Sequence, residues 1–326
     1  MSEGSPTKVA IACQGGGSHT AFTAGVLKGL LRDWDDAEYR LTGISGTSGG
    51  AFNAVAAWYG LLTGDETTAI ELLDALWADL TAKQPTDRIT NAWLVGTVAS
   101  ESTGLPIPQI SPYYFPLSSW AQDRIRRTLS RHIDFDAVPD LCTEAAPELV
   151  VGTVDVNGGV FETFTNENVT PEAVLASAAV PNLFEGVELH GHLHWDGLFS
   201  QNPPINDLMT IDPDHKPDEL WIIQINPQEV EGTPTTVDEI ADRRNELSGN
   251  LSLNQELRFI EWVNDWIEEG LLPPDKFSHT TVRRIQMGRR YHCTTKLDRS
   301  PAFIGELLEL GESQAEAFLQ EELATP

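Results

Sequence analysis

The chain has 326 residues, which is long for one domain and short for three, and 40% of them are hydrophobic, so it can bury a sizeable core and is not globally disordered. Its 49 acidic residues against 21 Lys and Arg give a formal charge of -28, a field that repels phosphate backbones and argues against nucleic-acid binding. Three scattered cysteines (Cys13, Cys142 and Cys293) exclude a disulfide framework and a four-thiolate zinc site, which indicates a reduced, cytoplasmic protein.

We expect neither a leader sequence nor a membrane span. The first eight residues are polar, and residues 9–13 are too short for a signal-peptide core. The longest weakly polar stretch, residues 51–62, falls short of the ~18 apolar residues that a span needs. Any association with membranes or storage granules is therefore expected to be peripheral.

Strands and helices are expected to alternate from the start of the chain. An apolar, β-branched run predicts a buried strand at 8–14, and Ser18 is placed to cap a helix whose apolar residues recur at helical spacing over 22–31. Further on, the patterns predict a strand at 40–44, helices at 51–62 and 65–80, and strands at 149–156 and 160–165 joined by a turn.

The second half continues the alternation. The expected elements are a helix at 171–179, a hairpin over 186–195 turning at His190-Gly191, a strand at 220–226, one or two helices over 237–269, a strand at 280–287 and a helix at 301–322. This order predicts an α/β fold, a three-layer sandwich with a central, mostly parallel sheet and added C-terminal helices. We expect a flexible tail over 1–7, a core over 8–210, and a strand and helices over 211–326 packed on the same domain.

A nucleophile motif follows the second expected strand. Gly46-Thr47-Ser48-Gly49-Gly50 matches G-x-S-x-G, between a strand and a helix. Such a turn lifts a serine hydroxyl out of the sheet, and Gly46 and Gly50 are small because larger side chains would clash. The alternative is a glycine-rich loop that contains a serine by chance.

Three consecutive glycines, Gly15, Gly16 and Gly17, follow the first expected strand. They let the backbone turn with its amides exposed, as an oxyanion hole requires. The competing interpretation is a dinucleotide fingerprint, which fails because position 20 is Thr and the second strand ends without an acidic residue.

A third element, Asp196-Gly197, ends the expected hairpin. A carboxylate at a strand end with a glycine behind it can approach another backbone closely, although an isolated Asp-Gly pair is more often only a turn.

Together the three elements resemble the patatin-like phospholipase family, in their order and spacing and over at least residues 8–230. The resemblance implies a Ser-Asp dyad on a patatin-like fold: Ser48 as nucleophile, Asp196 as general base, and the Gly15–Gly17 loop as oxyanion hole. It implies no cofactor, and it makes residues 8–210 the catalytic core.

The chain departs from the family pattern at three places. His19-Thr20 stands where Arg-Gly is frequent, so that arginine's anion contact is expected to be lost or weaker. Leu198 follows Asp-Gly where a small residue is usual, and Gln14 replaces a frequent acidic residue, with little expected effect because the oxyanion donors are backbone groups.

The histidines raise a metal alternative. His190, His192 and His194 alternate along the hairpin, and zinc would need three ligands converging at ~2.0–2.2 Å. A turn at His190-Gly191 directs His190 elsewhere, so we expect exposed hairpin histidines and no metal. His19, beside the glycine loop, is expected to contact substrate or to be a solvated or capping residue.

The segment between Pro106 and Trp120 is rich in proline and aromatic residues, including Tyr113, Tyr114 and Phe115. It is interpreted as a loop whose rings pack onto the core, and a lid or acyl-chain docking surface is the alternative.

The sequence thus predicts a serine acyl hydrolase that cleaves carboxylic esters, most readily of lipids. An intracellular depolymerase of polyhydroxyalkanoate storage polyesters, using the same dyad, is one alternative. A non-enzymatic lipid-binding or scaffold protein of the same fold is the other. The expected partner is a lipid or polyester substrate, at a membrane or granule surface, and no nucleic acid.

The acidic residues are spread along the chain, and Lys is scarce at 6 against 15 Arg. This composition resembles that of proteins from salt-loaded cytoplasm, in which salt screens the self-repulsion of the compact state. The alternative is an ordinary acidic protein.

The halophilic interpretation predicts that activity and melting temperature rise steeply between about 0.1 and 2 M KCl, because the Debye length shrinks to ~3 Å near 1 M salt. Thermal unfolding and ester hydrolysis across a KCl series measure this. Full stability in dilute buffer would contradict it.

Overall fold

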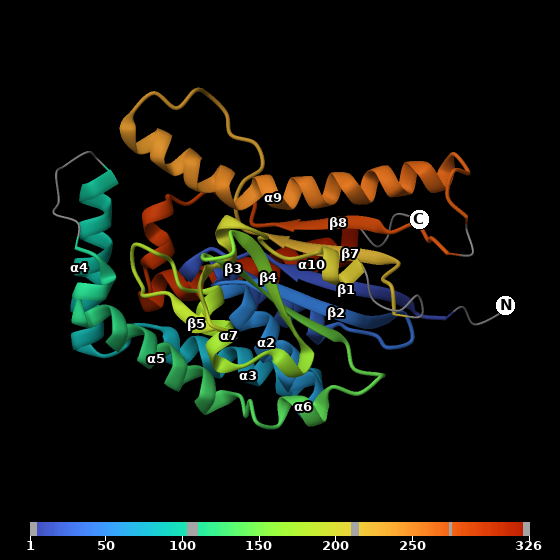
Figure 1. Ribbon diagram of the computed structural model, residues 1–326, viewed down its shortest axis with the longest axis horizontal. Coiled ribbons are helices and arrows are strands. Elements are labelled where there is room, and N and C mark those ends of the chain that lie inside the picture. Colours follow the sequence, from blue (N-terminus) through green and yellow to red (C-terminus); the bar gives the residue numbers. More distant parts are fainter. Residues whose placement is uncertain (1–4, 103–109, 210–214, 274–275, 322–326) are drawn as a thin grey trace.

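The computed structural model describes residues 5–102, 110–209, 215–273 and 276–321 (Figure 1). Its strands are β1 (Thr7–Cys13), β2 (Tyr39–Thr47), β3 (Glu148–Asp155), β4 (Val160–Thr165), β5 (Val187–Leu189), β6 (His192–Asp196), β7 (Glu219–Gln224) and β8 (Thr281–Gln286). Its α-helices are α1 (Ala21–Arg32), α2 (Gly49–Thr63), α3 (Glu66–Leu80), α4 (Pro85–Ser102), α5 (Pro116–His132), α6 (Val138–Leu141), α7 (Pro171–Ser177), α8 (Asn206–Met209), α9 (Val237–Glu268) and α10 (Pro301–Glu321). Short 3-10 helices are η1 (Gly17–Thr20), η2 (Pro112–Tyr114), η3 (Asn166–Asn168), η4 (Gly197–Phe199) and η5 (Cys293–Leu297).

One mixed sheet forms the middle layer, with the order β5-β6-β3-β2-β1-β7-β8 and β4 paired to β3. The strands β3, β2, β1, β7 and β8 run parallel, and β4, β5 and β6 join through antiparallel pairs. The predicted strands and the mostly parallel centre are confirmed. Parallel strands share the edge at which they end, so the loops after β1 and β2 meet there.

Helices cover both faces of the sheet, which confirms the three-layer prediction (Figure 1). On one face α1, α2, α3 and α10 enclose a core that includes Ile11, Ile44 and Trp221. On the other face α9 contributes Leu253, Leu257 and Ile260 to a smaller core. Strands buried on both faces are apolar throughout, which is why β1 and β7 were recognisable in the sequence.

The strand β3 has an arrangement on which the site depends. One of its edges pairs with β4 from Val150 to Asp155. The other edge pairs first with β2, up to Thr47 opposite Gly152, and then with β6, from Asp196 opposite Thr153. Two segments far apart in sequence therefore follow one another along β3.

Two long helices and one cap differ from expectation. The helices α4 and α5 were not predicted, and η2 and the start of α5 occupy part of the segment expected to be a loop; its residues 106–109 lie outside the described residues. Its rings do not pack onto the core, because Tyr114 is 84% exposed and Trp120 50% exposed. Ser18 does not cap α1: it lies in η1, and α1 follows Thr20 with no side-chain capping bond.

No helix in the described part of the chain is long and apolar enough to cross a membrane.

The helix α10 packs against α1 with almost no side chains between the two backbones. A Cβ on Gly311 would lie 2.2 Å from the Phe22 carbonyl oxygen, and one on Gly25 would lie 2.1 Å from that of Leu308. Lys28 of α1 also bonds Glu312 of α10 at 2.7 Å. We propose that residues 211–326 belong to the same folding unit as the core.

Gly311→Ala should therefore destabilise the whole protein by about 1–3 kcal/mol, because the two helices must move apart. Gly305→Ala is the matched control in the same helix, since a Cβ there meets nothing within 4 Å, and it should be neutral or stabilise by up to ~1 kcal/mol. Denaturant unfolding in molar KCl measures both. Equal effects, or a separate transition for the C-terminal part, would contradict the single unit.

Candidate active site

Ser48 lies in a sharp turn between β2 and α2. Its backbone has φ 56° and ψ −129°, a conformation that costs a non-glycine residue about 1–3 kcal/mol. The glycines around it allow the turn: a Cβ on Gly46 would lie 2.5 Å from the Gly50 carbonyl carbon, and a Cβ on Gly50 would lie 2.3 Å from the Cys13 oxygen. The strand, turn and helix anticipated from G-x-S-x-G are present.

The Ser48 backbone is fixed from α7. Its amide donates to Ser177 Oγ at 2.9 Å, and that hydroxyl donates to the Gly152 carbonyl at 2.6 Å. Ser48 is only 7% exposed, so its hydroxyl lies in a nearly closed environment.

Asp196 ends β6, and its carboxylate lies beside the Ser48 hydroxyl, a hydrogen-bonding group that lowers its pKa. The carboxylate also caps η4, where its Oδ1 accepts the Leu198 amide at 2.8 Å. Leu198 therefore contributes through its backbone, and its larger side chain does not prevent the contact. Gly197 allows the close approach, because a Cβ there would lie 2.5 Å from the Gly152 oxygen.

Burial raises the pKa of Asp196 from its ordinary value to about 7. The Leu198 amide, the Ser48 hydroxyl and the charge of Lys296 each act in the opposite direction, because they favour the ionised carboxylate. A carboxyl group with a pKa near neutrality can exchange a proton with a serine more readily than an ordinary aspartate.

The glycine loop lies against Ser48, since a Cβ on Gly15 would be 3.0 Å from the Ser48 Cβ. The Gly15 amide donates to Asn202 Oδ1 at 2.6 Å, so a side chain already engages it in this structure. The amides of Gly16 and Gly17 have no acceptor among the described residues. Gly17 takes φ +57°, which favours glycine.

A family model described as patatin-like phospholipase matches residues 11–209. The chain belongs to this family. The resemblance predicted from the motifs is confirmed, and as a patatin-like phospholipase the chain is an ester hydrolase of lipid acyl groups.

Two solved structures are similar to this patatin-like chain. VipD from Legionella pneumophila matches with a TM-score of 0.46 and 15% identity, over 97% of this chain and 67% of that chain. The type III effector protein ExoU matches with a TM-score of 0.36 and 16% identity, over 98% of this chain but only 56% of its own. No curated protein matches in sequence.

Gln14 has a larger role than the sequence suggested. Its Oε1 accepts the amides of Ile225 and Asn226 at 2.8 and 2.9 Å, and its Nε2 donates to the Gly249 carbonyl and Asn250. It is fully buried and joins the end of β1 to the segment after β7 and to α9. The position directly before the glycines was the available signal, but a single glutamine does not show its partners.

His19 is buried rather than solvated, being 3% exposed, and its Nε2 bonds Thr295 Oγ1 at 2.7 Å. Burial, together with the charge of Lys296, lowers the pKa of His19, so the ring is neutral at pH 7. It forms part of the packing around the glycine loop.

The hairpin histidines do not converge on one point. His190 and His194 both bond Glu162, at 2.9 and 2.7 Å, whereas His192 bonds Asp155 at 2.6 Å. The turn at His190-Gly191 is confirmed, with φ 52° and 81°. His194 is fully buried, so the expectation of exposed histidines is wrong for it.

One group in the described part of the chain has metal-ligand chemistry: Asp242, His292 and Cys293. Its carboxylate is already engaged, since Asp242 Oδ1 accepts the Cys293 amide at 2.7 Å and Oδ2 accepts Arg290 at 2.8 Å. These bonds join α9 to η5, and the arrangement fits a structural role.

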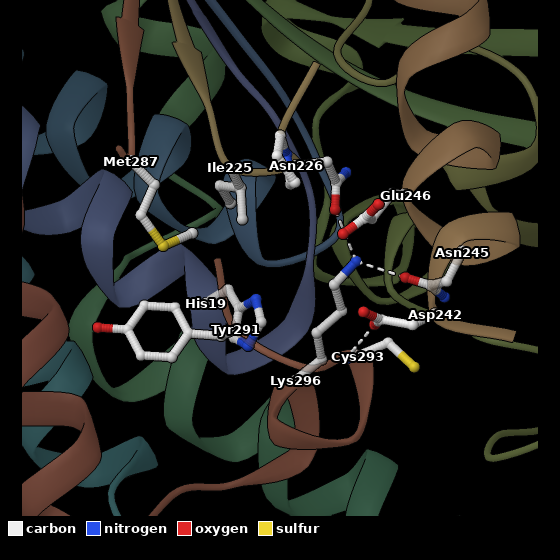
Figure 2. Close-up of a pocket in the computed structure, with 11 residues that line it drawn as sticks. His19, Ile225, Asn226, Asp242, Asn245, Glu246, Met287, Tyr291, Cys293 and Lys296 are labelled. Atoms are coloured by element: carbon white, nitrogen blue, oxygen red, sulfur yellow. Dashed lines mark hydrogen bonds between the residues drawn. The ribbon is translucent and has the colours of Figure 1, made fainter. Parts of the chain in front are cut away.

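A small pocket beside the glycine loop contains Lys296, which the sequence did not single out (Figure 2). Its Nζ donates to Asn226 Oδ1 at 2.8 Å and to Asn245 Oδ1 at 2.6 Å. As one of 6 lysines, far along the chain from either motif, it carried no local signal.

Proposed function

We propose that this patatin-like protein hydrolyses carboxylic esters of lipids with Ser48 as nucleophile and Asp196 as its base. The observation that carries the proposal is the position of the buried Asp196 carboxylate beside the Ser48 hydroxyl, which lowers its pKa. The free amides of Gly16 and Gly17 are suited to hold the oxyanion that forms on the substrate carbonyl.

In the first half-reaction Ser48 Oγ attacks the ester carbonyl carbon and its proton passes to Asp196. The carbonyl oxygen becomes an oxyanion near the Gly16 and Gly17 amides. The tetrahedral intermediate then collapses, the ester C–O bond breaks, and Asp196 returns the proton to the leaving alcohol.

In the second half-reaction water attacks the acyl-enzyme and gives a proton to Asp196. Collapse releases the carboxylic acid, and the proton returns to Ser48 Oγ. No histidine is needed because the pKa of Asp196, raised by burial to about 7, already suits a base at neutral pH.

The charge of -28 favours substrates without strong negative charge, or anionic lipids only when salt screens the repulsion. Acylglycerols and phospholipids at high salt fit this condition, and a neutral storage polyester is the alternative substrate. We propose a cytoplasmic location for the reaction, at the surface of membranes or granules.

Ser48→Ala should abolish labelling by a fluorophosphonate probe, and Asp196→Asn should slow it by about 10³-fold, because the nucleophile loses its base. Ser130→Ala, an exposed serine of α5, is the matched control and should label normally. The same variants are then compared in molar KCl on phospholipids, acylglycerols, short aryl esters and amorphous polyester.

Labelling that persists in Ser48→Ala would refute the dyad. Hydrolysis confined to the polymer would favour the depolymerase, and a native protein that neither labels nor hydrolyses would favour the scaffold alternative.

An exposed apolar stripe lies near this site, on η2 and the start of α5. Its members are 49–84% exposed: Ile110, which precedes η2, and Tyr113, Tyr114, Leu117 and Trp120. The segment is anchored toward Asp196, since Ser118 Oγ donates to the Leu183 carbonyl before β5, and α5 contacts α7, which holds Ser48.

We infer that this aromatic stripe docks on a lipid surface. Exposed aromatic and aliphatic side chains gathered in one segment are the kind that insert between lipid headgroups. Three of the four arginines of α5 are already paired with carboxylates: Arg124 with Asp87, Arg126 with Asp123 and Glu172, and Arg131 with Asp79. Docking is therefore expected to depend on the apolar side chains rather than on anionic headgroups.

The double variant Tyr114→Ser with Leu117→Ser should lower vesicle binding and long-chain ester hydrolysis by at least about 10-fold, because a tenfold loss needs only ~1.4 kcal/mol and burial of each side chain contributes up to ~1.5–3 kcal/mol. Hydrolysis of a soluble short aryl ester should be unchanged. Val160→Ser with Phe161→Ser, equally exposed on β4, is the control. Cosedimentation with phosphatidylcholine vesicles, with and without anionic lipid, measures binding; equal losses in both double variants would contradict the docking surface.

A further inference from the structure

The side chain of Lys296 runs along the glycine loop. A Cβ on Gly16 would lie 3.8 Å from Lys296 Cε, and a Cβ on Gly17 would lie 2.3 Å from the Lys296 carbonyl oxygen. The segment η5 therefore packs so closely on Gly17 that a side chain there would disturb it, while Gly16 is in ordinary van der Waals reach of the Lys296 chain. Lys296 is in a position to fix the two amides assigned to the oxyanion.

The ammonium group is held by neutral partners. Asn226 and Asn245 accept its two hydrogen bonds, as Figure 2 shows. No carboxylate of the described residues forms an ion pair with Nζ. The nearby acids of α9, Asp242 and Glu246, are instead bonded to Arg290 at 2.8 and 2.7 Å.

The Lys296 ammonium is solvated by amide groups and is not neutralised by a carboxylate. In a buried site of low dielectric its charge therefore still shifts the pKa of neighbouring groups. It lowers the pKa of Asp196 and, second to burial, that of His19. Burial lowers the pKa of Lys296 itself to about 8, while the charges of Cys293, Asp242, Glu246 and Asp196 raise it. At pH 7 the Lys296 side chain is therefore mostly in its protonated, ammonium form.

We propose that Lys296 is a positioning residue of the hydrolytic site, whose charge favours the ionised form of the Asp196 carboxylate and whose chain supports the Gly16–Gly17 amides. The inference rests on the proposed function, because it assigns Lys296 a role in the same proton transfer. It goes beyond that function in giving the C-terminal segment, outside the matched 11–209 region, a part in the reaction.

If Lys296 only supported the fold, its replacement would not change the pKa of Asp196. The deciding readout is therefore the pH dependence of Ser48 labelling by the fluorophosphonate, which needs no knowledge of the natural ester. In the wild type the rate should rise with pH through about 7, since Asp196 accepts a proton only when ionised.

In Lys296→Met this acid limb, the pH range over which the labelling rate rises, should move upward by about 0.5–1 pH unit. The reason is that the ionised Asp196 carboxylate loses a favourable charge. The labelling rate at pH 7 should then fall about 3- to 10-fold. Lys296→Arg, which keeps the charge, should keep the wild-type limb. Asn245→Asp leaves Lys296 in place but sets a carboxylate on its ammonium, and should move the limb in the same direction as Lys296→Met.

Lys28→Met is the matched control. Lys28 is a buried lysine on α1, bonded to Asp74 and Glu312 at 2.8 and 2.7 Å, away from the dyad. Its loss should lower the melting temperature and leave the acid limb unchanged.

If Lys296→Met does not fold, the pH dependence of labelling in Asn245→Asp tests the proposal in its place. A wild type labelled at Ser48 whose limb is unmoved in the folded variants overturns this inference alone. A wild type that does not label at Ser48 overturns the proposed function and this inference together.

Discussion

The two edges of β3 determine where the chemistry can occur. Because β4 occupies one edge, β2 and β6 share the other. Pairing with β2 ends at Gly152, and pairing with β6 begins at the next residue, Thr153. Ser48 turns away from the sheet directly after Thr47, and Asp196 enters directly opposite Thr153. Their proximity thus follows from strand register, and positions 46, 50 and 197 are glycines because backbones from several strands meet there.

The same crowding sets the electrostatics. Asp196 is only 1% exposed, so burial disfavours its charged form and raises its pKa to about 7. What prevents complete neutralisation is a small set of favourable contacts from the Leu198 amide, the Ser48 hydroxyl and Lys296. We propose that the Ser-Asp pair works because burial outweighs these contacts and leaves the pKa of Asp196 near 7.

Local signals predicted much of this arrangement. Apolar runs predicted β1, β2 and β7, and Gly-rich turns after β1 and β2 predicted the loop and the elbow, because these features are encoded by neighbouring residues. Partners that meet only in the folded chain were not predictable: Asn202, which occupies the Gly15 amide, and Lys296, which arrives from η5. The helix α5 was missed because its proline- and aromatic-rich start is typical of a loop.

We propose that Ser48 and Asp196 form one reacting pair beside the glycine loop. The most direct measurement is a crystal structure of the protein after reaction with a fluorophosphonate. The account predicts phosphorus bonded to Ser48 Oγ, the phosphoryl oxygen within hydrogen-bond distance of the Gly16 and Gly17 amides, and the Asp196 carboxylate beside the adduct. An adduct on another residue, or a phosphoryl oxygen directed away from the loop, would contradict it.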